Sequence, residues 1–186
     1  MTTELWNQAL IDQIDYHWRG AVRPRLEGLT DAEYLWEPAP GWSVRPRTGD
    51  DQPGVGPFTI DFEFPEPTPA PLTTIAWRLG HVIVGVLAMR SAGHFDGPPA
   101  DYGTWAYAGT AEEALAQLDA EYARWIAGVR ALGEEGLERP CGPTEGPYAE
   151  EPLAVLVLHI NRELIHHLAE VCLLRDLHLH TNGASR

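Results

Sequence analysis

The sequence predicts an all-α protein, a four-helix bundle with a long proline- and glycine-rich connection between its first and second helices. Two observations predict this class. Apolar residues recur at steps of three and four in four long segments, which is the spacing of one helix face. Alternation of the strand type is confined to one short stretch. Four such helices bury their apolar stripes most simply against one another.

The first helix is predicted over residues 5–27. Its apolar positions are Leu5, Trp6, Ala9, Leu10, Ile14, Trp18, Ala21 and Val22. Gly28 then supplies a helix stop. In the following connection, over residues 29–71, closely spaced prolines and glycines forbid long regular structure. We expect only a short helix over residues 31–35 there and a short extended segment over residues 58–64, where apolar and polar residues alternate.

The second helix is mostly apolar, so we expect it near the centre of the bundle. Thr73 or Thr74 is a suitable N-cap for it, and Gly93 is a suitable end. The third and fourth helices are predicted over residues 111–132 and 153–177. They are separated by a connection rich in glycine, proline and glutamate. Thr110, followed three residues later by glutamate, marks the start of the third helix.

Length and charge limit the kind of protein. With 186 residues the chain suits a single domain over residues 1–186, large enough to bury a core without disulfides. Asp and Glu outnumber Lys and Arg by 27 to 13, giving a net charge of −14. This excess would repel nucleic acid and anionic membrane surfaces, so we expect neither as a partner. Two cysteines form no disulfide framework, and the N-terminus lacks a signal-peptide pattern, so we expect a cytoplasmic protein.

The fourth helix carries an unusual group of metal-binding residue types. His159, Glu163, His166 and His167 fall within an arc of about 100° on a helix of 3.6 residues per turn. Aliphatic residues flank them, so the imidazoles and the carboxylate need partners. A divalent metal would supply such partners, and hydrogen bonds to neighbouring bundle residues would do so as well.

The second helix carries one histidine, His81, among leucine and valine residues, and it could add a further metal ligand to the group on the fourth helix. A lone histidine in an apolar setting is more often a core residue with its hydrogen bonds satisfied than a metal ligand. Paired with the group on the fourth helix, His81 becomes a candidate ligand. Three protein donors would leave open positions for water or substrate, which is the arrangement of a catalytic divalent site.

Three motifs give the chain a resemblance to the DinB-like superfamily. They are Gly28-Leu29-Thr30-Asp31-Ala32-Glu33 with Trp36, Pro38 and Gly41-Trp42-Ser43-Val44; Leu79-Gly80-His81; and Leu158-His159 through His166-His167. They cover most of the chain apart from residues 45–72 and 133–152. This superfamily comprises four-helix bundles that include proposed metal-dependent hydrolases and mycothiol- or bacillithiol-dependent S-transferases and isomerases.

The resemblance implies a ligand set. The family places one histidine on the second helix and a His-x-x-x-His pair on the last, and here these positions fall on His81, Glu163 and His167. Glu163 departs from the usual histidine. Two imidazoles and one carboxylate favour Zn or Ni and leave Fe or Mn open. His166 is an alternative ligand to His167, or a neighbour of the site.

His159 is a candidate catalytic residue, because an imidazole one turn before Glu163 could carry a proton. A capping or packing role is the alternative. The leading hypothesis is a metal-dependent hydrolase or a thiol-dependent transferase or isomerase that acts on a small molecule, with a low-molecular-weight thiol as a candidate cosubstrate. The resemblance also implies a homodimer. The rival hypotheses are a metal-free helical binding or stress-response module with structural histidines and a protein whose metal is purely structural.

Overall fold

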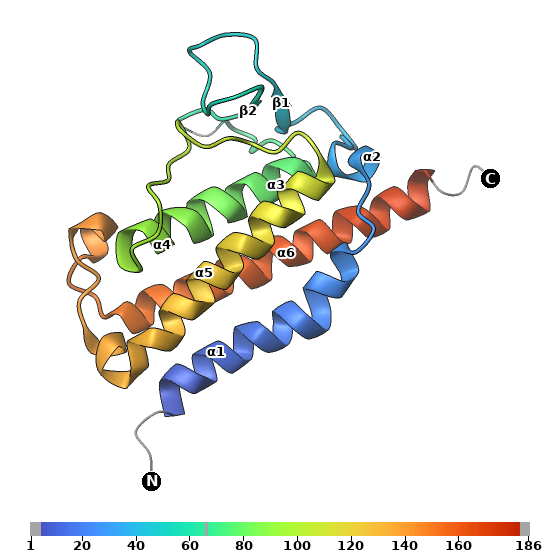
Figure 1. Ribbon diagram of the computed structural model, residues 1–186. Helices are drawn as coiled ribbons and strands as arrows, with labels where there is room; N and C mark the ends of the chain where they lie inside the picture. The colour runs from blue at the N-terminus through green and yellow to red at the C-terminus, as the bar shows by residue number, and fades with distance from the viewer. Residues whose placement is uncertain (1–4, 66, 183–186) are drawn as a thin grey trace.

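A computed structural model describes residues 5–65 and 67–182, and it shows a bundle of four long helical segments (Figure 1). The first is α1 (Leu5–His17), continued by a π-helical turn (Trp18–Val22) and a 3₁₀ turn (Arg23–Leu26). The second consists of α3 (Ile75–His81), the π-helical η3 (Val82–Ala88) and α4 (Met89–His94). The third and fourth are α5 (Ala111–Glu138) and α6 (Leu153–Asn182). The predicted all-α class is confirmed.

Local capping fixes where several helices begin. Thr74, rather than Thr73, caps α3, and its hydroxyl accepts a hydrogen bond from the Trp77 amide at 3.1 Å. Thr30 and Glu33 form a capping box at the start of the short α2 (Asp31–Tyr34). Gly28 ends the first segment with a φ of 67°, in the left-handed region that favours glycine.

Two predicted helix ends were wrong, and one was right. Gly93 does not end the second segment, which continues one residue further to His94. Gly133 breaks α5 with a φ of 57°, so the predicted end at residue 132 is confirmed, although a second helical stretch follows as far as Glu138. The fourth helix extends past residue 177 to Asn182. The connection before it also contains a 3₁₀ segment, η4 (Pro143–Tyr148).

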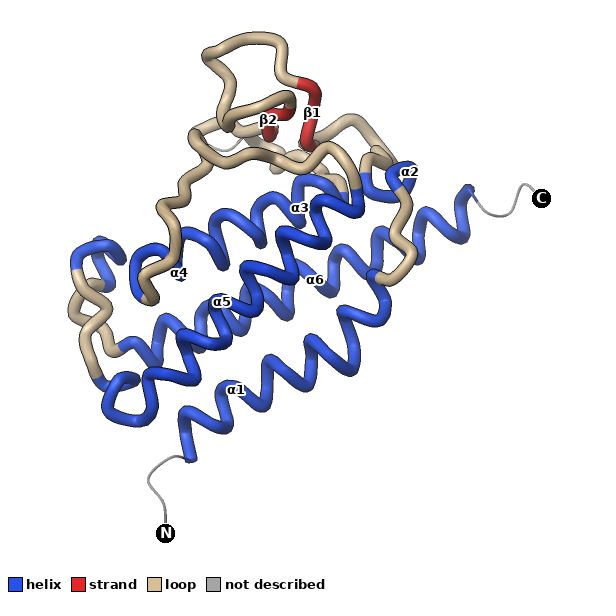
Figure 2. Tube along the Cα trace, in the orientation of Figure 1, coloured by secondary structure: helices blue, strands red, loops and turns tan. Residues whose placement is uncertain are grey.

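The long connection folds over one end of the bundle (Figure 2). Its strands β1 (Val44–Pro46) and β2 (Phe58–Ile60) pair antiparallel, with Val44 opposite Ile60. Only the first half of the predicted extended segment is therefore a strand. Trp42 ties this layer to the start of α3, because its amide donates to the Leu72 carbonyl and its carbonyl accepts from the Thr74 amide. The connection is thus held against the N-terminal turns of α3.

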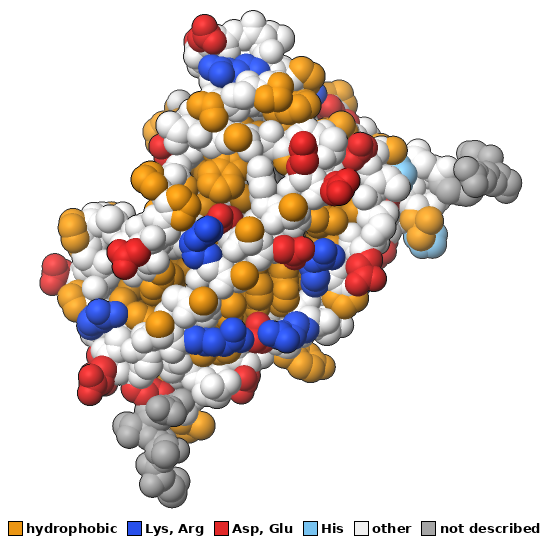
Figure 3. Space-filling model, viewed as in Figure 1, with side chains coloured by type: hydrophobic (Ala, Val, Ile, Leu, Met, Phe, Trp, Pro, Cys, Tyr) orange, Lys and Arg blue, Asp and Glu red, His pale blue; other side chains and the backbone are white. Residues whose placement is uncertain are grey.

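The core lies between the four helical segments. Fully buried side chains from three of them include Leu79, Leu118, Trp125 and Leu164. The stretch Ile75–His94 is long and apolar enough to cross a membrane by composition, yet 61% of its apolar window is buried inside this bundle. Such burial is the behaviour of a central core helix. Figure 3 shows acidic and basic groups interspersed on the outer face of the bundle.

Candidate metal centre

Three side chains from two helices come together between α3 and α6. One ligand atom each of His81, Glu163 and His167 lies within 4.8 Å of the other two. Glu163 and His167 are four residues apart on α6, so they project from the same face, and His167 Nε2 lies 3.3 Å from Glu163 Oε2. The rings of His81 and His167 are perpendicular, with centroids 4.8 Å apart. The three residues named by the resemblance therefore form one group.

A second layer of contacts holds His167 in place. Its Nδ1 lies 2.9 Å from Glu170 Oε2 and 3.2 Å from Arg78 Nη1, and Arg78 Nη1 lies 3.1 Å from the same Glu170 oxygen. His167 thus sits between two carboxylates, with Glu163 at Nε2 and Glu170 at Nδ1. In the tautomer in which Nδ1–H donates to Glu170, Nε2 presents a lone pair toward Glu163.

His81 is held by the loop before α5. Its Nδ1 lies 2.7 Å from the Tyr102 hydroxyl. Burial raises the pKa of Tyr102 to about 12, so its phenol keeps its proton at neutral pH. Burial first, then the nearby His167 and Arg78, lower the pKa of His81 to about 4. His81 is therefore neutral at pH 7, which is the form in which imidazole binds a metal.

His166 lies outside this group. Its side chain is 63% exposed, and its Nε2 lies 3.5 Å from Glu170 Oε1. With His167 and Glu170 it forms a second, more exposed group of potential ligands on α6 alone. The set that includes His81 is the better candidate, because it draws on two helices and leaves Glu170 to orient His167 through Nδ1.

His159 lies beside Glu163 rather than beside the two other imidazoles. Its Nδ1 lies 3.5 Å from Glu163 Oε1 and accepts a hydrogen bond from Arg162. The two oxygens of Glu163 therefore face different histidines, His159 at Oε1 and His167 at Oε2. The role of His159 as a proton carrier stays a prediction.

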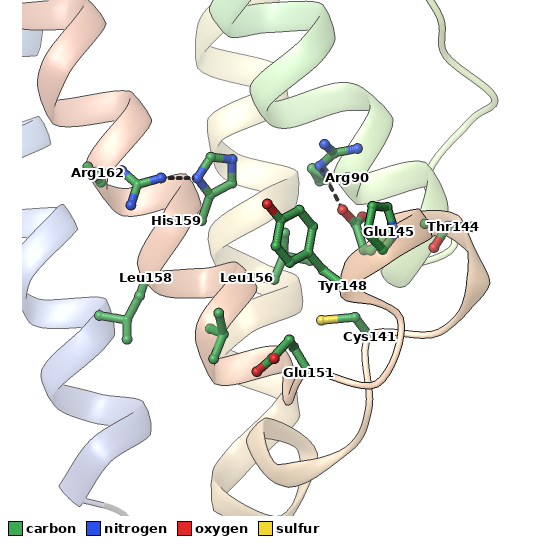
Figure 4. Close-up of a pocket in the computed structure, with 13 residues that line it drawn as sticks. Arg90, Cys141, Thr144, Glu145, Tyr148, Glu151, Leu156, Leu158, His159 and Arg162 are labelled. Carbon is green, nitrogen blue, oxygen red and sulfur yellow. Dashed lines mark hydrogen bonds and ion pairs between the residues drawn. The ribbon is translucent and has the colours of Figure 1, made fainter.

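Two adjoining cavities lead away from the group. One of about 200 Å³ is lined by His81 and Glu163, together with Arg90 and His159. Arg90 and His159 also line a cavity of about 700 Å³ beneath η4. Figure 4 shows that the His159 imidazole enters this cavity from α6 and the Arg90 guanidinium from α4. The larger cavity has the size of a small-molecule site.

Sequence reasoning missed some supporting residues. Arg78 lies one turn before His81 on α3, and this spacing is a signal that could have placed both on one face. Tyr102 lies in a loop between α4 and α5, where no periodicity identifies it. Arg90 reaches the cavities from α4, two turns beyond His81, and helical spacing alone does not separate it from a solvent-facing arginine.

Comparison with known proteins identifies the family of the chain. The family model described as DinB superfamily matches residues 13–171, which include every member of the group between α3 and α6. Neither the search of curated proteins nor that of solved structures finds a match. The chain belongs to the DinB superfamily.

Proposed function

We propose that this protein is a metal-dependent enzyme acting on a small molecule, with a divalent ion held by His81, Glu163 and His167. The position of His167 between two carboxylates carries the proposal. When its N–H lies on Nδ1 and donates to Glu170, the neutral imidazole faces Glu163 at Nε2 with no proton between the two groups. A cation at Nε2 removes that conflict, and Glu163 completes its ligation.

The donor set fits a catalytic ion. Two neutral imidazoles and one carboxylate suit Zn or Ni first, and Fe or Mn next. Three protein ligands leave coordination positions open, and the 200 Å³ cavity beside His81 and Glu163 gives them access to a ligand. When bound, such an ion lowers the pKa of water or of a thiol and supplies a nucleophile at neutral pH.

The surrounding residues would transfer the proton and enclose the substrate. His159 contacts Glu163 at 3.5 Å and lines both cavities, so it can accept a proton from a group in the smaller cavity and pass it outward. Val86, Met89 and Ile160 line the smaller cavity and limit water there. The 700 Å³ cavity would receive the rest of the substrate. These features suit hydrolysis and thiol-dependent transfer or isomerisation alike.

One observation favours a metal-free binding module as the second candidate. His167 with its N–H on Nε2 would donate to Glu163 and accept from Arg78 at Nδ1, so these contacts would be satisfied without an ion. In that case removing His81 would alter stability alone. Metal content therefore separates the two functions.

Cobalt substitution tests the enzyme proposal and separates its two reaction classes. We expect one bound Co(II) ion per chain, with a visible absorption spectrum that indicates a low coordination number of the ion. A thiol-dependent enzyme should show a new thiolate-to-cobalt charge-transfer band when cysteine or glutathione is added. A hydrolase should show none, but should cleave activated esters with a metal-dependent rate. His159→Gln should keep the cobalt and lower turnover. Absence of bound cobalt would overturn the proposal.

A homodimer and a cytoplasmic location belong to the same proposal. Exposed apolar residues on α1 and α6, among them Trp6 and Leu173, provide surface that a second copy could cover. Sedimentation equilibrium of the purified protein tests the dimer directly. A monomer at all concentrations would remove this part of the proposal and leave the metal site unaffected.

A further inference from the structure

Five aromatic rings form a closed circuit of neighbours on the side of His81 away from Glu163. The centroid distances are 6.4 Å for Trp42–Phe62, 6.3 Å for Phe62–Tyr102, 6.4 Å for Tyr102–His81, 5.5 Å for His81–Trp77 and 5.7 Å for Trp77–Trp42. Neighbouring ring planes differ by 13° to 36°, so the rings stand nearly parallel to one another around the circuit. We call Trp42, Phe62, Trp77, His81 and Tyr102 the aromatic wall.

The aromatic wall lines a cavity of its own. All five rings border a space of about 290 Å³, together with Ile60, Asp61, Glu63 and Phe64. His81 and Tyr102 are shared with the 200 Å³ cavity, whereas Glu163 borders only that smaller one. The two spaces therefore lie on different sides of the His81–Tyr102 pair. At about 290 Å³ the cavity lies at the lower end of ligand pockets, so it suits a small molecule or a head group.

Hydrogen bonds hold the wall in shape. Trp77 Nε1 donates to the Asp61 carbonyl at 2.8 Å, which ties α3 to the segment after β2. His81 Nδ1 and the Tyr102 hydroxyl form a hydrogen bond of 2.7 Å, and the two ring planes differ by 13°. The wall is therefore formed before any ligand arrives, and a ligand would not have to order it.

The cavity is open to solvent and carries negative charge. Phe62 and Phe64 are 60% and 86% exposed, an unusual position for two phenylalanines in a soluble domain. Asp61 is engaged by Arg45 Nε at 2.6 Å. Glu63 has no ion pair within residues 5–65 and 67–182, so its charge is available to a ligand. Exposed aromatic surface beside an unpaired carboxylate indicates a ligand that is both apolar and cationic.

We propose that this cavity binds a small organic cation whose charged end is an alkylated ammonium group. Ring faces attract such a cation by about 0.5–2 kcal/mol each, and the alkyl groups bury against them without leaving an N–H unsatisfied. Glu63 supplies the counter-charge. A neutral planar molecule would gain stacking on the rings but nothing from Glu63. The site shares His81 with the proposed metal centre but uses neither Glu163 nor His167.

Choline and its uncharged isostere 3,3-dimethyl-1-butanol test the proposal, because they share shape and differ in charge. Both are titrated into chelator-treated, metal-free protein and followed by NMR shift changes and calorimetry. We expect saturable choline binding at least tenfold tighter than that of the isostere, and tetramethylammonium should also bind. Because the protein is metal-free, the choline result does not depend on whether the proposed metal-dependent activity is correct.

Paired variants locate the binding. Phe62→Leu keeps an apolar side chain but removes a ring from the wall, and it should weaken choline binding at least fivefold. Tyr16→Leu is the matched control, since it removes an exposed ring from α1. Glu63→Gln should weaken choline binding about threefold by removing one charge near the cation. Glu135→Gln, at an exposed position on α5, should leave it unchanged.

Three results would overturn the proposal. The first is no saturable binding of choline or tetramethylammonium. The second is equal affinity for choline and the neutral isostere, which would show an apolar pocket without cation recognition. The third is choline binding that Phe62→Leu and Tyr16→Leu reduce equally, because the cation would then lie away from the aromatic wall.

Discussion

The two sides of His81 are lined by different kinds of side chain. On one side, the charged side, lie the Glu163 carboxylate and the His167 imidazole, with the charged Glu170 and Arg78 behind them. On the other lie the remaining rings of the aromatic wall and the carboxylate of Glu63. One imidazole thus borders both a group of potential metal ligands and an apolar, electronegative cavity.

This difference follows from the elements that supply each side. The charged side comes from α3 and α6, whose backbones fix the direction of each side chain within a rigid bundle. The aromatic side adds Trp42 and Phe62 from the long connection and Tyr102 from a loop. A helix pair suits a site that must hold fixed geometry, whereas loops suit one that selects a ligand. The two sides should therefore respond separately to substitution.

The largest expected effect is loss of a ligand on the charged side. His167→Ala should lower zinc affinity by more than the roughly 10–100-fold typical of residues that only support a ligand. His166→Ala is the matched control and should change affinity less than about threefold, because its side chain is 63% exposed and directed at Glu170. Competition with a chromogenic chelator measures both. Equal losses in the two variants would move the site to the exposed group on α6.

The next effect concerns the groups behind the ligands. Glu170→Gln should weaken zinc binding roughly 10–100-fold, because it removes the carboxylate that fixes the tautomer of His167. Tyr102→Phe should act similarly on His81, toward the lower end of that range. Tyr148→Phe, at an exposed residue of η4, is the control. Unchanged affinity in Glu170→Gln would show that the residue does not orient the site.

A pH effect should isolate His81 in the metal-free protein. Its folded pKa of about 4 lies below its unfolded value of 6.5. As the pH falls between these values, the unfolded chain takes up a proton that the folded chain does not, so stability decreases. Between pH 7 and pH 4.5 the wild type should lose about 2 kcal/mol more unfolding free energy than His81→Gln. Urea titrations at both pH values measure this, and equal losses would contradict it.

The smallest expected effect tests whether the two sides are independent. Phe62→Leu should alter zinc affinity less than about twofold, because Phe62 lies outside the candidate ligands and their hydrogen-bonded supports. Measuring zinc and choline affinity on the same preparation gives both numbers. A parallel loss of zinc would show that the sides are coupled through His81.

Much of the charged side could be predicted from the sequence, because helical spacing alone places Glu163 and His167 on one face. His81 required the resemblance to a family, since spacing within one helix says nothing about which helix lies opposite. The helix boundaries were less certain, because Gly93 and Gly133 carry the same stop signal but only Gly133 interrupts a helix. The aromatic side depends on the path of the connection, which no periodicity encodes.

The most direct test of the central claim is the metal content of the purified protein after loading with zinc or nickel and exhaustive dialysis. We expect about one equivalent per chain in the wild type and under about one tenth of an equivalent in His81→Ala, with both proteins folded by circular dichroism. No retained metal in the folded wild type, or the same content in His81→Ala, would contradict a metal centre shared between α3 and α6.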